Sequence, residues 1–524
     1  MEHLSIEIVD GTQVLVPADL STMTTYVLLE QEDWFEREMP FVRRFLRPGM
    51  TALDIGANIG IYSLVMGRLV GPTGAIHAFE PASSPRGLLL AAREANGLRH
   101  LHVHPVALSS AAGRGQLSRT GVSEIASLQA DGTDGETVDI STLDDFDAAA
   151  GWASPDFVKI DAEGEEARII DGAGAFLERH SPLIMLEAKT ERVVNTQAFA
   201  GLARHGYRFY RALPDAAALV PCDISVALAS FELNVLACKP DRAHALALRG
   251  LLVDAPVRWQ PDSRSLPIAA VKPLRRFAYA KALPALFDPR RAIDPTYRDA
   301  LVAFGRWRSR DLPLPESCGA LFHAYEQLSA LVAAAPTTAR LATLARVAWE
   351  AGRQGDTLAA LERLITADPS RIALDEPFWV PCARYDTVNP KGLLAEWFLS
   401  AAAEQYEKLR LFSSFFGPTS TNVDVLCDLP FPSAEMLRRR ALCALRDGRR
   451  RRSRRGCCSR RRIIAMPCSG PEWRPGKTEC RSLAFRIQAD RGEAQTMINR
   501  PTACASLASA TCRWRCGARV RPKT

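Results

Sequence analysis

Two hydrophobic patterns alternate along the chain between residues 51 and 240. Short, nearly continuous apolar runs of four to eight residues are typical of buried strands, and they predict strands at 51–55, 75–80, 101–108, 157–161, 182–188, 207–211 and 232–237. Apolar residues with helical spacing separate the first of these runs, and they predict helices at 61–70, 85–96 and 163–178. Strands that alternate with helices indicate an α/β protein with a doubly wound, mostly parallel sheet.

The sequence on either side of this region has a different character. Residues 1–50 form a predicted cap segment, with a strand pair followed by a helical segment at 30–46 (EQEDWFEREMPFVRRFL), and residues 51–240 then form the sheet domain. Residues 241–299 are rich in Pro and Arg and predict a linker, whereas 300–445 predict an α-helical region.

An internal similarity lies within the helical region. The segments LSALVAAAP and LERLITADP align at a spacing of 33 residues, which is close to the tetratricopeptide period. Two matches are fewer than the three or more repeats that a solenoid needs. An ordinary helical extension therefore explains the region equally well.

Charge divides the chain near Arg446. The last 79 residues, 446–524, carry 21 Lys and Arg against 5 Asp and Glu, a net charge of +16, so the rest of the chain has a net charge of −9. Eight of the 13 cysteines lie between Cys443 and Cys516. The tail has no sustained period, which predicts disorder. A frameshifted end explains its composition better than a nucleic-acid-binding arm or a zinc site, so we expect no nucleic-acid partner.

Length and composition allow a substantial core. The chain has 524 residues, of which 47% are hydrophobic and 24% are charged. No uncharged apolar stretch reaches the roughly 18 residues of a membrane span. The N-terminus lacks the basic and apolar segments of a secretory signal. We therefore expect a cytoplasmic protein without a membrane span.

A cofactor loop follows the first buried strand, with Asp54, Gly56, Asn58 and Gly60 at alternating positions. A glycine-bearing turn between a strand and a helix lets a ligand approach the backbone beside the helix N-terminus. Glu80 ends the second strand, where a carboxylate can bind two ribose hydroxyls. These features indicate a cofactor that contains adenosine.

The glycine spacing and the charges favour one such cofactor. A dinucleotide site has glycines at offsets 0, 2 and 5, whereas here the offsets are 0 and 4. Asp54, Asp161 and Glu163 would repel the two phosphates of NAD. They suit S-adenosylmethionine, which carries two positive charges and no phosphate. A nicotinamide-dependent oxidoreductase is therefore the poorer interpretation.

Four motifs together make the similarity specific to a family. They occur in a fixed order, and they are ALDIGANIGIYSL (52–64), AFEP (78–81), TLDDF (142–146) and VKIDAEGEEARIIDGA (158–173). With these motifs, residues 51–210 resemble the FkbM-type family of S-adenosylmethionine-dependent methyltransferases. The resemblance implies a Rossmann-like class I fold with a seven-stranded sheet, and usually methyl transfer to oxygen.

The resemblance also implies cofactor-binding residues. It places Asp54, Gly56, Asn58, Gly60 and Glu80 on the cofactor, with Glu80 at the ribose. Its remaining cofactor positions are Asn96, Ala107 and Leu108, the last two near the adenine. Simpler roles stay open, because Asp54 can cap its turn and Asn96 can end its helix.

Candidate catalytic residues lie at the end of the fourth expected strand. Asp161, and after it Glu163, can accept a proton from a hydroxyl acceptor. Alternatively, Glu163 only favours the N-terminus of the next helix. Lys159 alternates with Asp161 along the strand and can pair with it. Positioning of donor and acceptor alone can also account for catalysis.

Two further groups attract attention without changing the prediction. His100, His102 and His104 recur at period 2, but no carboxylate lies at ligand spacing, so we expect no metal. Trp34, Phe35 and Phe41 precede the first buried strand and form either a lid or, as we prefer, part of the core.

The sequence therefore predicts an S-adenosylmethionine-dependent O-methyltransferase that acts on a hydroxyl of a sugar, glycan or small natural product. The alternative is a methyltransferase-like interaction protein whose 300–445 helices bind a protein partner. The intact loop and Glu80 favour the enzyme, because a fold that had lost cofactor binding would be expected to lose these residues.

Overall fold

The structure is a computed structural model, and it describes most of the first 446 residues. The described ranges are 2–119, 126–129, 135–152, 154–190, 193–214, 217–224, 232–260, 267–309, 311–367, 373–417 and 421–446. The chain divides into two compact units, 1–449 and 450–524. All described residues lie in the first unit, so the predictions for the basic tail fall outside them.

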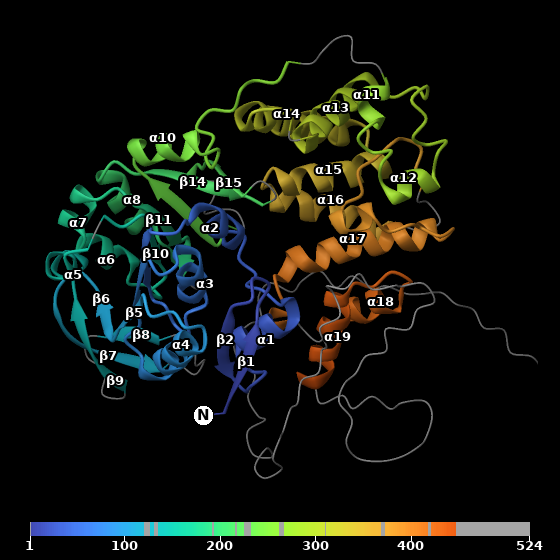
Figure 1. Ribbon diagram of the computed structural model, residues 1–524. Helices are drawn as coiled ribbons and strands as arrows, with labels where there is room; N and C mark the ends of the chain where they lie inside the picture. The colour runs from blue at the N-terminus through green and yellow to red at the C-terminus, as the bar shows by residue number, and fades with distance from the viewer. Residues whose placement is uncertain are drawn as a thin grey trace, which may run out of the picture. The chain divides into compact units, whose positions relative to one another are not determined.

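An eight-stranded sheet organises the N-terminal part (Figure 1). Its order is β15 (Ala218–Pro221), β14 (Arg208–Leu213), β16 (Asn234–Cys238), β11 (Leu183–Glu187), β10 (Phe157–Ile160), β3 (Thr51–Ile55), β4 (Ala75–Phe79) and β5 (Leu101–His104). The five strands from β11 to β5 are parallel, and the other three pair antiparallel. The doubly wound α/β fold is thus confirmed, with one strand more than the seven that the resemblance implies.

Both faces of the sheet are buried, as parallel strands require. Helices α2 (Met39–Phe45), α3 (Ile61–Val70), α4 (Ser83–Ala95) and α10 (Pro240–Leu248) pack on the face that carries Ala52, Phe157 and Met185. Helices α5 (Leu143–Ala150), α6 (Glu166–Asp171), α7 (Gly174–Arg179) and α8 (Thr196–Arg204) pack on the opposite face, which carries Leu53 and Val158. The alternation of residues along each strand therefore builds two cores.

The expected strand 101–108 is divided at Pro105. β5 ends at His104, and β6 (Val106–Leu108) leaves the main sheet. There it pairs with β9 (Gly135–Ser141) in a second sheet that also contains β7 (Gly113–Arg119) and β8 (Ala126–Gln129). Proline has no N–H to donate to a strand ladder, which explains a break at this position.

The expected helix 163–178 is likewise divided in two. α6 ends at Asp171 and α7 begins at Gly174. A Cβ at Gly172 would lie 2.3 Å from the Ser109 carbonyl oxygen, so the chain packs against the second sheet at this break. The hydrophobic period continues across the break and hides it in the sequence.

The N-terminal segment forms a hairpin and a helix before α2. β1 (His3–Glu7) pairs antiparallel with β2 (Gln13–Pro17), and α1 (Met23–Gln31) follows. The turn from α1 to α2 returns the chain to the sheet, where Phe41 and Phe45 are fully buried.

The C-terminal part of the unit is helical. Short helices α11 (Pro267–Val271) and α12 (Ala278–Ala282) precede α13 (Pro295–Ser309), α14 (Leu314–Ala334), α15 (Thr338–Glu350), α16 (Gln354–Thr366), α17 (Leu394–Leu411), α18 (Thr421–Asp428) and α19 (Ala434–Arg446). The two aligned segments at 33-residue spacing fall mainly in α14 and α16. Tyr279 and Phe287 come from the stretch 241–299 that the sequence predicts as a linker, and both are buried in the core of these helices. The domain boundaries drawn from the sequence stay a prediction. No helix among the described residues is both long and apolar enough to cross a membrane.

Candidate functional site at the carboxyl edge of the sheet

Polar side chains gather at the carboxyl ends of the central strands, where the strand order reverses between β10 and β3. Lys159 on β10 lies directly beside Asp54 on β3 in the parallel register. The Lys159 Nζ contacts Asp161 Oδ2 at 2.6 Å. The structure therefore brings together three of the residues that the sequence selects. In open α/β sheets, ligands bind at this type of edge.

Asp54 is almost fully buried, with an exposed fraction of 1%. Its Oδ2 accepts a hydrogen bond of 2.5 Å from Ser63 Oγ on α3. Its Oδ1 has no hydrogen-bond partner among the described residues. Burial raises the pKa of the Asp54 carboxyl, although the nearby Lys159 opposes this. A buried acceptor atom without a donor is costly, so Oδ1 is suited to receive a hydrogen bond from a ligand.

Lys159 is the cation of this site, and it is buried with an exposed fraction of 4%. Its ammonium group lies over the Tyr62 ring, 5.0 Å from the ring centroid. Burial alone would lower its pKa, but the negative charges of Asp161, Asp54 and Glu36 outweigh burial and raise the pKa. The side chain is therefore a fixed positive charge and not a base.

The two loop glycines allow the chain to pack against itself. Gly56 has φ +80°, and a Cβ there would lie 1.8 Å from the Asp161 carbonyl oxygen. Gly60 has φ +88°, and its Cβ would lie 2.1 Å from Leu89 Cδ1 on α4. Any side chain would push the loop away from β10 or α4. Glycine is thus required for the loop's own packing, in addition to any ligand approach.

Glu80 fixes the other side of the loop. Its Oε2 accepts a hydrogen bond from the Asn58 backbone N–H and its Oε1 accepts one from the Ala82 backbone N–H, both at 2.8 Å. Asn58 itself has φ +51°, a left-handed conformation that Asn tolerates. Burial raises the Glu80 pKa to about 7, against the effect of the two N–H donors. The loop and the end of β4 therefore form one hydrogen-bonded unit.

The segment between α1 and α2 supplies a carboxylate that sequence reasoning missed. Glu36 accepts hydrogen bonds from Tyr62 Oη at 2.7 Å, Trp34 Nε1 at 2.9 Å and Asn234 Nδ2 at 2.8 Å. Burial raises its pKa. Through Tyr62, Glu36 joins the group around Lys159. No local pattern marks Glu36, because only the tertiary fold brings residues 34–36 to the sheet.

Glu187 is a second carboxylate that was missed. It ends β11, next to β10 in the sheet. Burial, followed by the negative charges of Asp161, Glu163 and Glu166, raises its pKa to about 9. Glu163 itself has φ +49° in the turn after β10. Glu187 could have been predicted from the sequence, because polar residues at the carboxyl ends of parallel strands lie at the same edge of the sheet.

Asn96 lies apart from this site. It caps the C-terminus of α4, at the opposite end of the helix from Glu80. Its side chain donates to the Gln13 carbonyl at 2.7 Å and accepts from the Gln13 N–H at 3.0 Å. The structure therefore uses Asn96 to hold β2 against α4 and does not bring it to the other candidate residues.

The remaining candidates occupy two kinds of position. Ala107 and Leu108 are buried in β6, and Ala107 packs with Ala82, just beyond Glu80. Of the three aromatic residues before β3, Phe41 belongs to the core. Trp34 and Phe35 are half-buried, and their ring centroids lie 4.8 Å apart.

Together these groups define the class of the domain. The strand order and the glycine loop are those of a Rossmann-like α/β domain, a class in which ligands bind at the carboxyl edge of the sheet. Carboxyl groups from four segments, those of Glu36, Asp54, Asp161 and Glu187, interact with the one lysine, and this excess of carboxyl groups favours a ligand that bears positive charge.

The family follows from comparison with known proteins. Residues 54–209 match the model of the methyltransferase FkbM domain. The segment is also similar to the 31-O-demethyl-FK506 methyltransferase FkbM of Streptomyces tacrolimicus, with 32% identity over 24% of this chain and 60% of that protein. The predicted resemblance to the FkbM-type methyltransferase family is thus confirmed for residues 54–209. The chain spans about 60% of the length of this curated relative.

Solved structures of low identity also resemble the chain. A methyltransferase FkbM from Methylobacillus flagellatus matches with 18% identity, a TM-score of 0.26, and coverage of 43% of this chain and 56% of that one. An O-methyltransferase from Bacillus cereus, in complex with SAH, matches with 12% identity, a TM-score of 0.25, and coverage of 43% and 92%. At these scores the structures add no argument, and the fold assignment rests on the sheet itself.

Replacement of Gly56 by alanine tests the packing of the loop. We expect Gly56→Ala to lower the free energy of unfolding by about 2 kcal/mol or more, because the Cβ meets a backbone oxygen and φ is positive. Gly87→Ala is the matched control. Gly87 lies within α4, and a Cβ there would meet no atom within 4 Å, so this change should stabilise the protein by about 0.5–1 kcal/mol. Urea unfolding followed by circular dichroism measures both, and equal effects would contradict the proposed packing.

Proposed function

We propose that the protein is an S-adenosylmethionine-dependent methyltransferase that transfers a methyl group to a hydroxyl oxygen. The observation that carries this proposal is the buried Asp54, whose Oδ1 lacks a donor among the described residues, beside a glycine loop and several carboxylates. This set of negatively charged hydrogen-bond acceptors suits a ligand with a positively charged amino acid moiety. It would disfavour the pyrophosphate of a dinucleotide, because like charges repel at short range.

The residues that hold the cofactor are assigned from this fit. Asp54 and the loop of Gly56, Asn58 and Gly60 would bind its amino acid part, and Glu80 would bind the ribose. Ala107 and Leu108 provide apolar surface beyond Glu80 for the adenine. When bound, S-adenosylmethionine supplies the methyl group from its sulfonium. Asn96, which lies at the far end of α4, is left out of this assignment.

Asp161 is the proposed proton acceptor. Its carboxylate is held by Lys159 at 2.6 Å and is half-buried at the sheet edge. Asp161 would accept the hydroxyl proton that the acceptor has to lose when it is methylated by bound S-adenosylmethionine. Lys159 keeps this carboxylate in place, and Glu163 is the second candidate for the base.

The acceptor class is inferred from one relative. The name of the Streptomyces relative, a 31-O-demethyl-FK506 methyltransferase, indicates a substrate that lacks a methyl group on one oxygen. A small natural product or a sugar hydroxyl is accordingly the proposed acceptor here, and a cytoplasmic location is part of the same proposal.

Calorimetric titration of S-adenosylmethionine into the full chain tests the cofactor assignment. We expect saturable binding that Asp54→Ala weakens about 10- to 100-fold, because the side-chain acceptor of a hydrogen bond from the charged ligand is removed. Glu94→Gln, on the exposed side of α4, should bind like the wild type. A parallel titration with NADH should show no binding. Absence of S-adenosylmethionine binding to the folded wild type would refute the proposal.

The Glu80 pKa predicts a pH dependence of this binding. Because the pKa lies near 7 in the free protein, the carboxylate is mostly protonated at pH 6 and mostly ionised at pH 8. If the ribose hydroxyls bind the ionised form, affinity falls about tenfold between pH 8 and pH 6. Glu80→Gln should bind weakly and with a flatter profile. An unchanged profile in this variant would assign the pH dependence to another group.

Turnover of the Asp161 variant tests the proposed base. With an acceptor found by screening hydroxylated natural products and glycosides, release of S-adenosylhomocysteine gives the rate. Asp161→Asn should lower the rate about 10²- to 10⁴-fold, the usual contribution of a general base. Cofactor affinity should change little, since asparagine can still accept a hydrogen bond from Lys159. A rate close to that of the wild type would leave positioning alone as the mechanism.

A further inference from the structure

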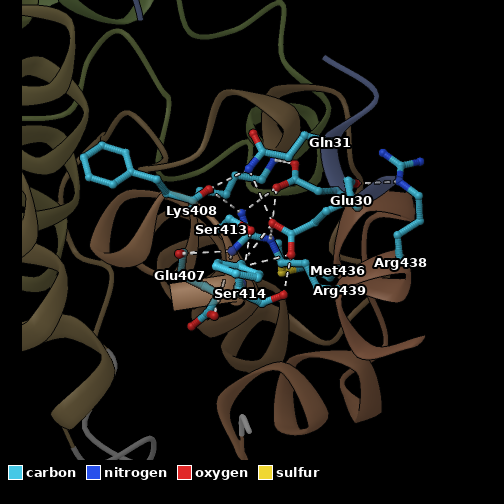
Figure 2. Close-up of polar contacts among 12 residues, drawn as sticks. Glu30, Gln31, Glu407, Lys408, Ser413, Ser414, Met436, Arg438 and Arg439 are labelled. Carbon is cyan, nitrogen blue, oxygen red and sulfur yellow. Dashed lines mark hydrogen bonds and ion pairs between the residues drawn. The ribbon is translucent and has the colours of Figure 1, made fainter. Parts of the chain in front are cut away.

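The last helices of the described chain bind the N-terminal segment through a buried polar cluster. Figure 2 shows Glu30, at the end of α1, facing Ser414 and Arg439. The Ser414 N–H donates to Glu30 Oε2 at 3.1 Å, the Ser414 hydroxyl donates to the same oxygen, and Arg439 Nε lies 3.4 Å from Oε1. None of these three side chains is more than 2% exposed.

Neighbouring residues extend the cluster along both segments. Arg438 Nε donates to the Glu30 carbonyl at 2.7 Å, and Arg438 Nη1 pairs with Glu32 at 3.1 Å. Gln31 Nε2 donates to the Phe412 carbonyl at 2.6 Å, which also accepts from Arg439 Nη2 at 3.2 Å. The end of α1 is therefore held by partners that lie about 380 to 410 residues later in the chain.

Phe412 is placed by these bonds in an unfavourable conformation. Its φ of +57° is rare for a bulky residue and costs of the order of 1–3 kcal/mol. Its ring centroid lies 5.7 Å from that of Phe35. Strained residues of this kind persist where the surrounding structure imposes them, often at functional sites.

The cluster continues directly into the candidate site. Glu30 is anchored to the C-terminal helices, and six residues later Glu36 is anchored to Tyr62 beside Lys159. Trp34 donates to Glu36, and Phe35 contacts Phe412. The turn at 31–38 thus has one end fixed by the helices and the other fixed at the carboxyl edge of the sheet. A second link lies nearby, where the Arg37 guanidinium is 5.8 Å from the centroid of the Trp349 ring on α15.

We propose that the C-terminal helices help to position the residues of the transferase site. Glu30, Ser414 and Arg439 hold the 31–38 turn in place, and Glu36 of this turn then supports the cofactor edge of the sheet through its hydrogen bond with Tyr62. Arg439 is a positioning residue, since it acts through the turn and does not reach the site itself. The rings of Trp34, Phe35 and Phe412 contact one another in sequence and add apolar contacts to the same turn. This inference rests on the proposed binding of S-adenosylmethionine.

A buried ion pair alone is weak support for such a role, because the desolvation of both charges can cancel their attraction. The cluster does, however, specify one arrangement of the turn. Without Arg439, the buried Glu30 carboxylate would keep its hydrogen bonds from Ser414 but lose this cation, and Glu407 and Glu435 would lose the same cation.

The loss of this buried charge partner would let the end of α1 and the turn after it move. Because Glu36 lies in this turn, such a movement would also change the position of Glu36 beside Tyr62, and this would couple the helices to the cofactor edge.

The test compares two adjacent arginines of α19. Arg439→Met removes the buried partner of Glu30, whereas Arg440→Met removes a partly exposed pair with Asp428. We expect Arg439→Met to weaken S-adenosylmethionine binding about tenfold, within the usual range of coupling between sites, and to raise hydrogen exchange at 31–38. Arg440→Met should leave both unchanged, and Arg439→Lys should restore part of the affinity.

A double-mutant cycle separates positioning from a general loss of stability. If Arg439 acts through Glu36, then Glu36→Gln and Arg439→Met together should weaken binding no more than the stronger single change. Additive effects, or wild-type affinity of folded Arg439→Met, would overturn the inference. If Arg439→Met fails to fold, Ser414→Ala should show the same direction with a loss of about two- to tenfold, as expected for one hydrogen bond.

The same measurements distinguish failure of the inference from failure of the proposed function. If the wild type does not bind S-adenosylmethionine, the proposed function fails. The exchange comparison still decides the mechanical coupling, because Arg439→Met must loosen 31–38 more than Arg440→Met does. Equal exchange in the two variants would overturn the coupling by itself.

Discussion

The positive charge of Lys159 is the constraint on which the site depends. Asp54, Asp161 and Glu36 lie around this buried ammonium group, and their negative charges keep it protonated by raising its pKa. Without the cation, these carboxyl groups at a buried sheet edge would be both desolvated and mutually repelled, and the raised pKa values of Asp54 and Glu36 would rise further. The parallel register that sets Lys159 beside Asp54 is therefore an electrostatic requirement as well as a topological one.

The same electrostatic constraint distinguishes the carboxyl group that is paired with Lys159 from the one at the next strand end. Glu187 lies at the next strand end among Asp161, Glu163 and Glu166, and its pKa of about 9 keeps it neutral at pH 7. Asp161, by contrast, contacts Lys159 directly. The site therefore holds both a neutral carboxyl group, which can donate a hydrogen bond, and a carboxyl group that is paired with a cation. Sites that need both a hydrogen-bond donor and a proton acceptor commonly combine carboxyl groups in different environments.

Much of the fold can be predicted, because the buried parallel strands are short apolar runs and the loop residues follow one of them. Asp54, Gly56 and Glu80 can be selected as candidate site residues for the same reason, since polar residues and glycines that directly follow a strand are local signals. Asn96 is grouped with them by the sequence although it serves β2, because a helix end carries no information about its tertiary partner. Pro105 divides a strand that hydrophobicity alone does not divide. Glu36 cannot be found, because its link to Tyr62 arises only when distant segments meet.

The N-terminal segment contains both residues whose structure follows from local sequence and residues whose role depends on distant segments. Its residues 39–45 form a helix that packs on the sheet, as the sequence predicts, and Phe41 belongs to the core. Residues 32–38 belong to the same expected helical segment, but they form a turn between α1 and α2, so that part of the prediction is wrong. Residues 30–36 instead connect the C-terminal helices to the Lys159 group through buried polar bonds. Apolar contacts tolerate small shifts between packed elements, whereas hydrogen-bonded buried charges do not. A helical region joined to the sheet domain in this way fixes the geometry of the site, and so its role cannot be separated from that of the domain it follows.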